Sequence, residues 1–216
     1  MEPDLNGLIP TLRPYVARIL SHQAASEREH RLQTTADLAQ AAIESDSDMA
    51  LTFICTHNSR RSHLAHVWAE VAARCFGLDG VRCFSGGTEA TSCNPRTIQA
   101  FVRAGFSVEL PDGETDNPIV RLHYHEDAPA VECFSKVYNE AGNPSSRYIA
   151  MMCCSDVSEK CPVVHGATER IPLHYEDPKV ADGTTEEEQR YDERCFQIGC
   201  DMFRLMSIVS ERRTSI

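Results

Sequence analysis

Residues 49–62 read MALTFICTHNSRRS, and this stretch decides the fold. Ala50–Cys55 is a short apolar run of the kind that forms a buried strand. Five polar residues follow, and a helix is expected to start at Arg61. A thiol therefore stands at the end of a strand, while an arginine and a hydroxyl group stand where a helix begins.

Such a strand–loop–helix unit forms a cradle for a tetrahedral oxyanion. Successive loop N–H groups and the helix N-terminus supply donors, and the planar guanidinium of Arg61 can clamp two oxygens. The same positive field favours a thiolate at Cys55. The implied chemistry is nucleophilic attack by sulfur on a phosphate-like anion. The predicted substrate-binding residues are Thr56, His57, Asn58, Ser59, Arg60 and Arg61.

The composition bounds the kind of protein. With 216 residues, 42% hydrophobic and 25% charged, the chain is long enough for one globular domain with a sizeable core. A net charge of −11 argues against non-specific nucleic-acid or anionic-membrane partners. Neither a membrane-length apolar run nor a signal-peptide pattern is found in the sequence. We therefore expect a cytoplasmic protein.

Ten cysteines without a secretion signal indicate reduced thiols rather than a disulfide framework. Cys93 and Cys133 have no distinctive context. The most informative thiols are Cys55 and a cluster formed by Cys153, Cys154 and Cys161. Four others lie in amphipathic or strand-like runs, where a free cysteine behaves as a small hydrophobe: Cys75, Cys83, Cys195 and Cys200.

From residue 48 to residue 216 strand-like and helical patterns alternate, which predicts an α/β fold. Alternation of this kind favours a four-stranded parallel sheet with helices on both faces, and ligands then bind at the carboxyl ends of the strands. Helices are predicted for Arg61–Phe76, from Asn94 to Ala104, and for a long C-terminal segment. The four predicted strands are Ala50–Cys55, Gly80–Ser85, Arg147–Cys154 and Glu169–Leu173.

Two segments fall outside this rhythm. The hydrophobic pattern of residues 1–47 predicts an N-terminal extension of two helices. A polar linker separates it from the main domain at residues 48–216. Residues 107–146 are rich in Asp, Glu, Pro, Gly and Asn. They are interpreted as a surface insertion, with a hairpin near the active site as its natural form. Two strand-like runs inside it are Ile119–Tyr124 and Val131–Ser135.

Four motifs in the right order resemble a known superfamily. Cys-x5-Arg-Ser after the first strand, Asn94-Pro95-Arg96, and Asp177-Pro178 are similar to the low-molecular-weight protein tyrosine phosphatases. The fourth, Cys154 with Cys161 after the third strand, resembles the thioredoxin-coupled arsenate reductases built on that phosphatase fold. The resemblance covers residues 50–210 and leaves the N-terminal helices outside.

The resemblance implies roles for the residues of the loop. Cys55 would attack arsenate held by the loop and Arg61, and Asp177 would protonate the leaving oxygen as a general acid. Ser62 would donate a hydrogen bond to the thiolate, and Asn58 would maintain the shape of the loop.

It also implies a relay of three thiols. Cys154 would attack the arsenic adduct on Cys55, releasing arsenite and leaving a Cys55–Cys154 disulfide. Cys161 would then exchange into that disulfide, and reduced thioredoxin would open the Cys154–Cys161 bond. No tightly bound cofactor is needed.

Three positions depart from the family pattern. Arg60 stands where the loop usually has a second cysteine, and His57 stands where it usually has glycine. In the reductases a glutamate on the first helix helps to hold potassium, and the matching position here is His66. We therefore predict neither a potassium site nor another metal site.

The chief alternative is a low-molecular-weight phosphatase that hydrolyses phosphate monoesters through a phosphocysteine intermediate. Those enzymes usually carry aromatic residues just after the Asp-Pro pair, where they grip a phenyl ring. Here residues 179–182 read KVAD, and only Tyr175 precedes the pair. This difference favours a small inorganic oxyanion. A second alternative is a non-catalytic anion- or metal-sensing module that the N-terminal helices couple to a partner.

Individual motifs also have simpler interpretations. Cys153 and Cys154 could merely end a buried strand, or join Cys161 and His165 in a metal site, although their spacing lacks a zinc knuckle. Asp177-Pro178 alone would suit a turn. His123-x-His125 is more typical of a solvated hairpin face than of a metal site.

Overall fold

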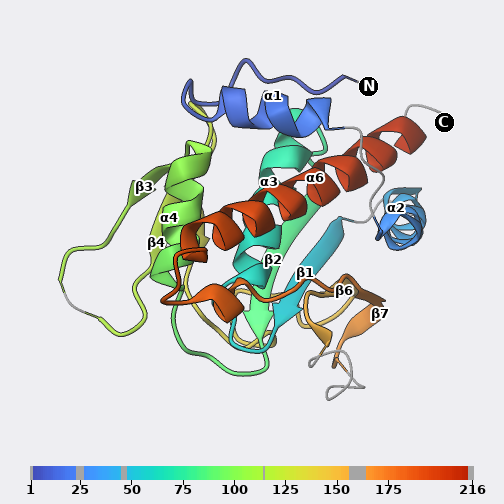
Figure 1. The fold of residues 1–216 in the computed structure, drawn as a ribbon. Helices are drawn as coiled ribbons and strands as arrows, with labels where there is room; N and C mark the ends of the chain where they lie inside the picture. The colour runs from blue at the N-terminus through green and yellow to red at the C-terminus, as the bar shows by residue number, and fades with distance from the viewer. Residues whose placement is uncertain (1, 23–26, 45–47, 114, 156–163, 214–216) are drawn as a thin grey trace.

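The computed structural model describes residues 2–22, 27–44, 48–113, 115–155 and 164–213. At its centre is a four-stranded parallel sheet flanked by helices, with strand order β2-β1-β6-β7 (Figure 1). The predicted α/β fold is therefore confirmed. The strands are β1 (Met49–Cys55), β2 (Val81–Gly87), β6 (Tyr148–Met152) and β7 (Ala167–Pro172).

Helices connect and cover these strands. α3 (Arg61–Cys75) joins β1 to β2, and α4 (Pro95–Ala104) follows β2. The long α6 (Glu187–Arg213) crosses the molecule and packs against α3 and α4 as well as the N-terminal helices (Figure 1). Aromatic packing explains this arrangement, because the fully buried Trp68 of α3 makes edge contacts with Phe106 and Phe203.

The N-terminal segment forms α1 (Arg13–Ser21) and α2 (Glu29–Glu44), so both predicted helices are present. Tyr15 stacks on Trp68 with 5.5 Å between ring centroids, and Val16 and Ile19 are buried in the same hydrophobic cluster as β1. α2 contacts β1, β7 and α6. The division of the chain at residue 48 stays a prediction, but the two helices contribute directly to the common core.

The insertion forms a three-stranded antiparallel sheet of β3 (Ser107–Glu109), β4 (Val120–His123) and β5 (Val131–Cys133). The two predicted strand-like runs are confirmed as β4 and β5. The outer part of the insertion is exposed, with Leu110 61% accessible. Its return segment, which we define as residues 134–138, instead runs inward, and Ser135 and Lys136 are buried.

Within the described residues, no helix is both long enough and apolar enough to cross a membrane.

Candidate active site

The predicted loop lies between β1 and α3 at the carboxyl end of the sheet, as expected. Cys55 ends the strand and is buried, and its Sγ lies 3.1 Å from Ser62 Oγ. Asn58 has a φ of 45°, the left-handed region that asparagine tolerates better than most residues. Its side-chain amide donates to Ser62 Oγ at 2.9 Å. The predicted roles of Ser62 and Asn58 therefore have the required geometry.

The backbone of the loop turns its carbonyl groups toward the protein. The carbonyl oxygens of Cys55, Thr56 and Ser59 accept from backbone N–H groups of Thr88, Glu89 and Asn94, and that of His57 accepts from Ser135 Oγ. Among the described residues, no protein acceptor takes a hydrogen bond from the N–H groups of residues 57–60. The helix α3 also begins without a side-chain cap. Free N–H groups in a nest at a helix N-terminus are the arrangement that binds an oxyanion.

Arg61 occupies the first turn of α3 and is largely buried. It donates to the Tyr175 carbonyl at 3.0 Å and to Asp177 Oδ2 at 2.7 Å. Its Nε is buried without a partner among the described residues. An unpaired buried donor is costly unless a ligand satisfies it, so this atom supports an anion site beside the loop.

Asp177 begins the short 3-10 helix η1 (Pro178–Ala181). Its Oδ1 accepts from the Lys179 N–H at 3.1 Å, which is the turn that the simpler interpretation of Asp-Pro expects. Its Oδ2 contacts Arg61. Asp177 can therefore take part in the turn and in the site at once, because Oδ1 makes the contact within the turn and Oδ2 contacts Arg61.

Arg60 has different partners from those of Arg61. Its guanidinium donates to the hydroxyl of Tyr191 at 2.8 Å and lies 3.4 Å from Asp182 Oδ2. Tyr191 in turn donates to Asp182. The side chain of Arg60 is thus engaged by α6 and the segment after η1, which leaves its backbone N–H as the group it offers to an anion.

Cys153 and Cys154 follow β6 directly, and both are buried. Cys154 Sγ lies 3.7 Å from Thr56 Oγ1, at the first residue of the loop. Cys153 Sγ instead faces the Met151 carbonyl, and burial, together with the neighbouring Cys55 and Cys154, raises its pKa well above the ordinary range. One thiol therefore contacts Thr56 of the loop, while its neighbour faces a carbonyl group of its own strand. Cys161 lies outside the described residues.

The return segment of the insertion holds the other side of the loop. Ser135 Oγ donates to the His57 carbonyl and accepts from the Thr91 N–H, both at 2.7 Å. The Lys136 N–H donates to Asn58 Oδ1 at 3.0 Å. Asn117 pairs with the backbone of Ser135 in both directions, at 2.7 and 2.9 Å. These contacts fix His57 and Asn58, the second of which has the positive φ.

Close approach of these segments requires Gly86 and Gly87 at the end of β2. A Cβ on Gly86 would lie 2.3 Å from the Tyr138 Cα, and one on Gly87 would lie 2.7 Å from the Thr56 carbonyl oxygen. Both distances are below any real contact, so side chains here would push the return segment and the loop apart.

Two histidines of α3 lie beside the return segment of the insertion. His63 approaches the Phe134 carbonyl at 3.2 Å. Burial lowers the pKa of His63 to about 4, and burial together with Lys136 and His63 lowers that of His66 to about 3. Both imidazoles are therefore neutral near neutral pH. Within the described residues, no group of three His, Cys, Asp or Glu side chains is arranged to hold a metal ion.

Sequence reasoning missed the residues that support the loop from a distance. The return segment reads FSKVY and carries no motif, and nothing local identifies the Tyr175 carbonyl as a partner of Arg61. The Asn94-Pro95 motif did carry a signal: Asn94 caps α4 through the Arg96 N–H and holds the Ser59 carbonyl. The other contacts arise only when distant segments pack together.

Comparison with known proteins was made by sequence and by structure. The family described as "Low molecular weight phosphotyrosine protein phosphatase" matches residues 50–122. The arsenate reductase of Bacillus licheniformis is 26% identical over 148 residues, which cover 68% of this chain and 87% of that protein. The arsenate reductase of Bacillus subtilis is 27% identical over 142 residues, covering 66% and 83%.

Solved structures overlap less closely. A low-molecular-weight phosphotyrosine phosphatase from Vibrio cholerae has a TM-score of 0.48 at 13% identity, covering 78% of this chain and 99% of that one. A thioredoxin-dependent arsenate reductase from Corynebacterium glutamicum has a TM-score of 0.38 at 17% identity, covering 95% and 86%. Overlap this low transfers no function. The family match and the sequence relatives confirm the resemblance: this chain is similar in sequence to low-molecular-weight phosphotyrosine protein phosphatases over residues 50–122, and to arsenate reductases.

Proposed function

We propose that this protein reduces arsenate to arsenite through Cys55, Cys154 and Cys161, with reduced thioredoxin as the electron donor. Its sequence relatives are named arsenate reductases, which supports the class of reaction. The observation that carries the proposal is the position of Cys154, whose Sγ lies 3.7 Å from Thr56 Oγ1. A second thiol at the edge of the oxyanion loop is needed for reduction and has no role in phosphate-ester hydrolysis.

The first step forms a bond between sulfur and arsenic. The N–H groups of residues 57–60 and Arg61 hold arsenate, and the Cys55 thiolate displaces one of its oxygens. Asp177 in its acid form gives a proton to that oxygen, which leaves as water. Arg61 contacts Asp177 in the structure, so the anion must take over part of this ion pair.

The second step reduces arsenic. The Cys154 thiolate attacks the sulfur of Cys55, the sulfur–arsenic bond breaks, and its electron pair remains on arsenic, which leaves as arsenite. Cys161 then attacks the Cys154 sulfur and frees Cys55 as a thiolate. The Cys154–Cys161 disulfide takes two electrons from the dithiol of thioredoxin, which becomes oxidised in turn.

The surroundings of the loop favour a small anion over an aryl ester. Tyr175, the aromatic residue closest to the Asp-Pro pair in sequence, is buried under Arg28. After the pair, Val180 is 71% exposed and contributes no aromatic wall. These residues give an aromatic leaving group little to pack against.

The experiment that tests the proposal is arsenate-dependent NADPH oxidation with thioredoxin and thioredoxin reductase. We expect multiple turnovers by the wild type and none by Cys154→Ser, while p-nitrophenyl phosphate hydrolysis survives in both. Cys153→Ala is the matched control, because this neighbouring thiol faces the Met151 carbonyl and not Thr56, and it should keep arsenate turnover. Absence of arsenate turnover with equal ester hydrolysis in all three proteins would identify a phosphatase with incidental cysteines.

A further inference from the structure

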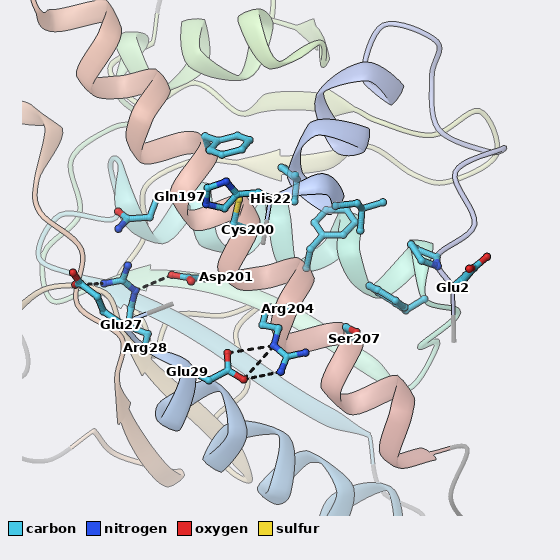
Figure 2. A pocket seen from close by; sticks show the side chains of 16 residues that line it. Glu2, His22, Glu27, Arg28, Glu29, Gln197, Cys200, Asp201, Arg204 and Ser207 are labelled. Carbon is cyan, nitrogen blue, oxygen red and sulfur yellow. Dashed lines mark hydrogen bonds and ion pairs between the residues drawn. The ribbon is translucent and has the colours of Figure 1, made fainter. Parts of the chain in front are cut away.

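A buried ion pair joins the N-terminal segment to α6 at some distance from the loop. Arg28 Nε lies 2.8 Å from Asp201 Oδ2, and the two side chains are only 9% and 4% exposed (Figure 2). Burial of two charges is costly and is offset only by good geometry and further hydrogen bonds. Both residues lie outside the stretch matched by the phosphatase family, so the family pattern does not account for them.

Arg28 also contacts the segment that leads to Asp177. Its Nη1 donates to the His174 carbonyl at 3.3 Å, and its guanidinium carbon lies 4.7 Å from the centre of the Tyr175 ring. Arg28 therefore holds Tyr175 on its ring and on the peptide group that precedes it.

The next contacts lead to the oxyanion site. The Tyr175 carbonyl accepts from Arg61 Nη1 at 3.0 Å, and Asp177 accepts from Arg61 Nη2 at 2.7 Å. One short stretch, residues 174–177, thus receives Arg28 on one side and Arg61 on the other. Displacement of this stretch would move the acceptors that orient the guanidinium of Arg61.

We propose that Arg28 and Asp201 are positioning residues for the active site, holding residues 174–177 so that Arg61 and Asp177 meet the oxyanion at the correct place. The inference rests on the proposed function and deepens it. When an anion displaces Asp177, the Tyr175 carbonyl is the contact that Arg61 can keep. The position of that carbonyl group then sets the position of the guanidinium. A misplacement of about 1 Å at such a site can lower the reaction rate about a hundredfold.

The molecule contains a matched control for this proposal. Arg204 of α6 binds Glu29 of α2 with Nη2–Oε1 at 2.7 Å, beside Arg28 and Asp201 (Figure 2). This pair also joins the N-terminal segment to α6, and it lines the same pocket of about 880 Å³. Among the contacts of the described residues, neither Arg204 nor Glu29 bonds to residues 174–177.

The test measures the position of Arg61 without relying on arsenate chemistry. Cys55 is alkylated with anionic iodoacetate and with neutral iodoacetamide, and its modification is followed by peptide mass spectrometry. Wild type should prefer iodoacetate because Arg61 and the loop attract its carboxylate. In Arg28→Met/Asp201→Leu, which leaves neither charge unpaired, this preference should fall about tenfold. Arg204→Met should retain it.

Two further measurements keep the outcome decisive. Thermal unfolding establishes that each variant is folded. If the double variant is not folded, Arg28→Lys is measured in its place. That variant keeps a charge for Asp201 but loses the planar group that reaches both His174 and Tyr175, so a partial fall is expected. A folded double variant with wild-type preference would overturn the proposal, as would an equal loss in Arg204→Met. Failure of arsenate turnover with the preference still dependent on Arg28 would reject only the proposed function.

Discussion

The loop at residues 55–62 is held on one side by the return segment of the insertion and on the other by the acid segment, which we define as residues 173–182. The return segment uses buried, neutral hydrogen bonds from Ser135 and Lys136 to the loop backbone and to Asn58. The acid segment uses partly exposed charges, with Asp177 on Arg61 and Asp182 on Arg60. Buried neutral bonds are hard to exchange, whereas an incoming anion can replace a carboxylate at an arginine. We infer that one side preserves the shape of the loop and the other responds to the substrate.

The largest effect is expected from Asp177→Asn in the acid segment. An amide cannot supply the proton that the leaving oxygen needs, so turnover should fall by roughly 10²–10⁴-fold. Stability should change by less than about 1 kcal/mol, because the lost ion pair is partly exposed. Steady-state arsenate or p-nitrophenyl phosphate kinetics across pH 5–8 would measure the first effect, and urea unfolding the second. Unchanged turnover across this range would remove Asp177 from the mechanism.

Asn58→Ala, on the insertion side, is expected to lower the stability of the fold more than Asp177→Asn does. Alanine tolerates the positive φ poorly and leaves the Lys136 N–H unpaired in the interior, so a loss of roughly 2–4 kcal/mol is expected. Urea unfolding would measure it.

Asn58→Gly is the matched control for that variant. Glycine accepts the backbone conformation but cannot restore the hydrogen bonds, so it should recover part of the stability. Equal stability of the Ala and Gly variants would mean that backbone strain at residue 58 contributes little.

The stability of the fold should also depend on pH, through two histidines beside the insertion. Burial holds the pKa of His63 at about 4 and that of His66 at about 3, below the unfolded value of about 6.5. The unfolded chain therefore binds more protons as pH falls through 6.5, and stability should decrease continuously toward pH 4 and below. Between pH 7.5 and 5.5 the two histidines should together cost about 2–3 kcal/mol.

Urea unfolding at several pH values would measure this dependence. The variants His63→Gln and His66→Gln should each flatten it by about half. A stability profile that stays level between pH 7.5 and 5.5 would contradict the buried neutral state of both imidazoles.

The smallest effect is expected from Asp182→Asn. This change weakens the contact with Arg60, and partly exposed pairs contribute about 0.2–1 kcal/mol that salt screens. Unfolding at low and high salt should show a difference from wild type that shrinks as salt is added. An effect as large as that of Asn58→Ala would mean that the acid segment supports the shape of the loop as firmly as the insertion does.

Local sequence predicted much of this protein. The apolar run before Cys55, the polar loop and the helix from Arg61 were identified because strands and helices have different hydrophobic periods. The loop geometry follows from the same local order, since a strand, a turn and a helix must place Cys55 and Arg61 at one edge of the sheet. The start of the helix at Asn94 could be predicted for a similar reason, because an N-cap residue and a following proline are local signals.

Tertiary structure alone decided what holds those groups in place. Nothing near Ser135 in the sequence indicates that it binds the His57 carbonyl 78 residues away, or that Arg28 contacts the peptide beside Tyr175. The physical reason is that these contacts are hydrogen bonds to backbone groups, which every residue possesses, so no residue type marks the partner. Periodicity and short motifs determined the chemistry that the loop offers. The packing of the insertion and the N-terminal helices determined how rigidly that chemistry is held.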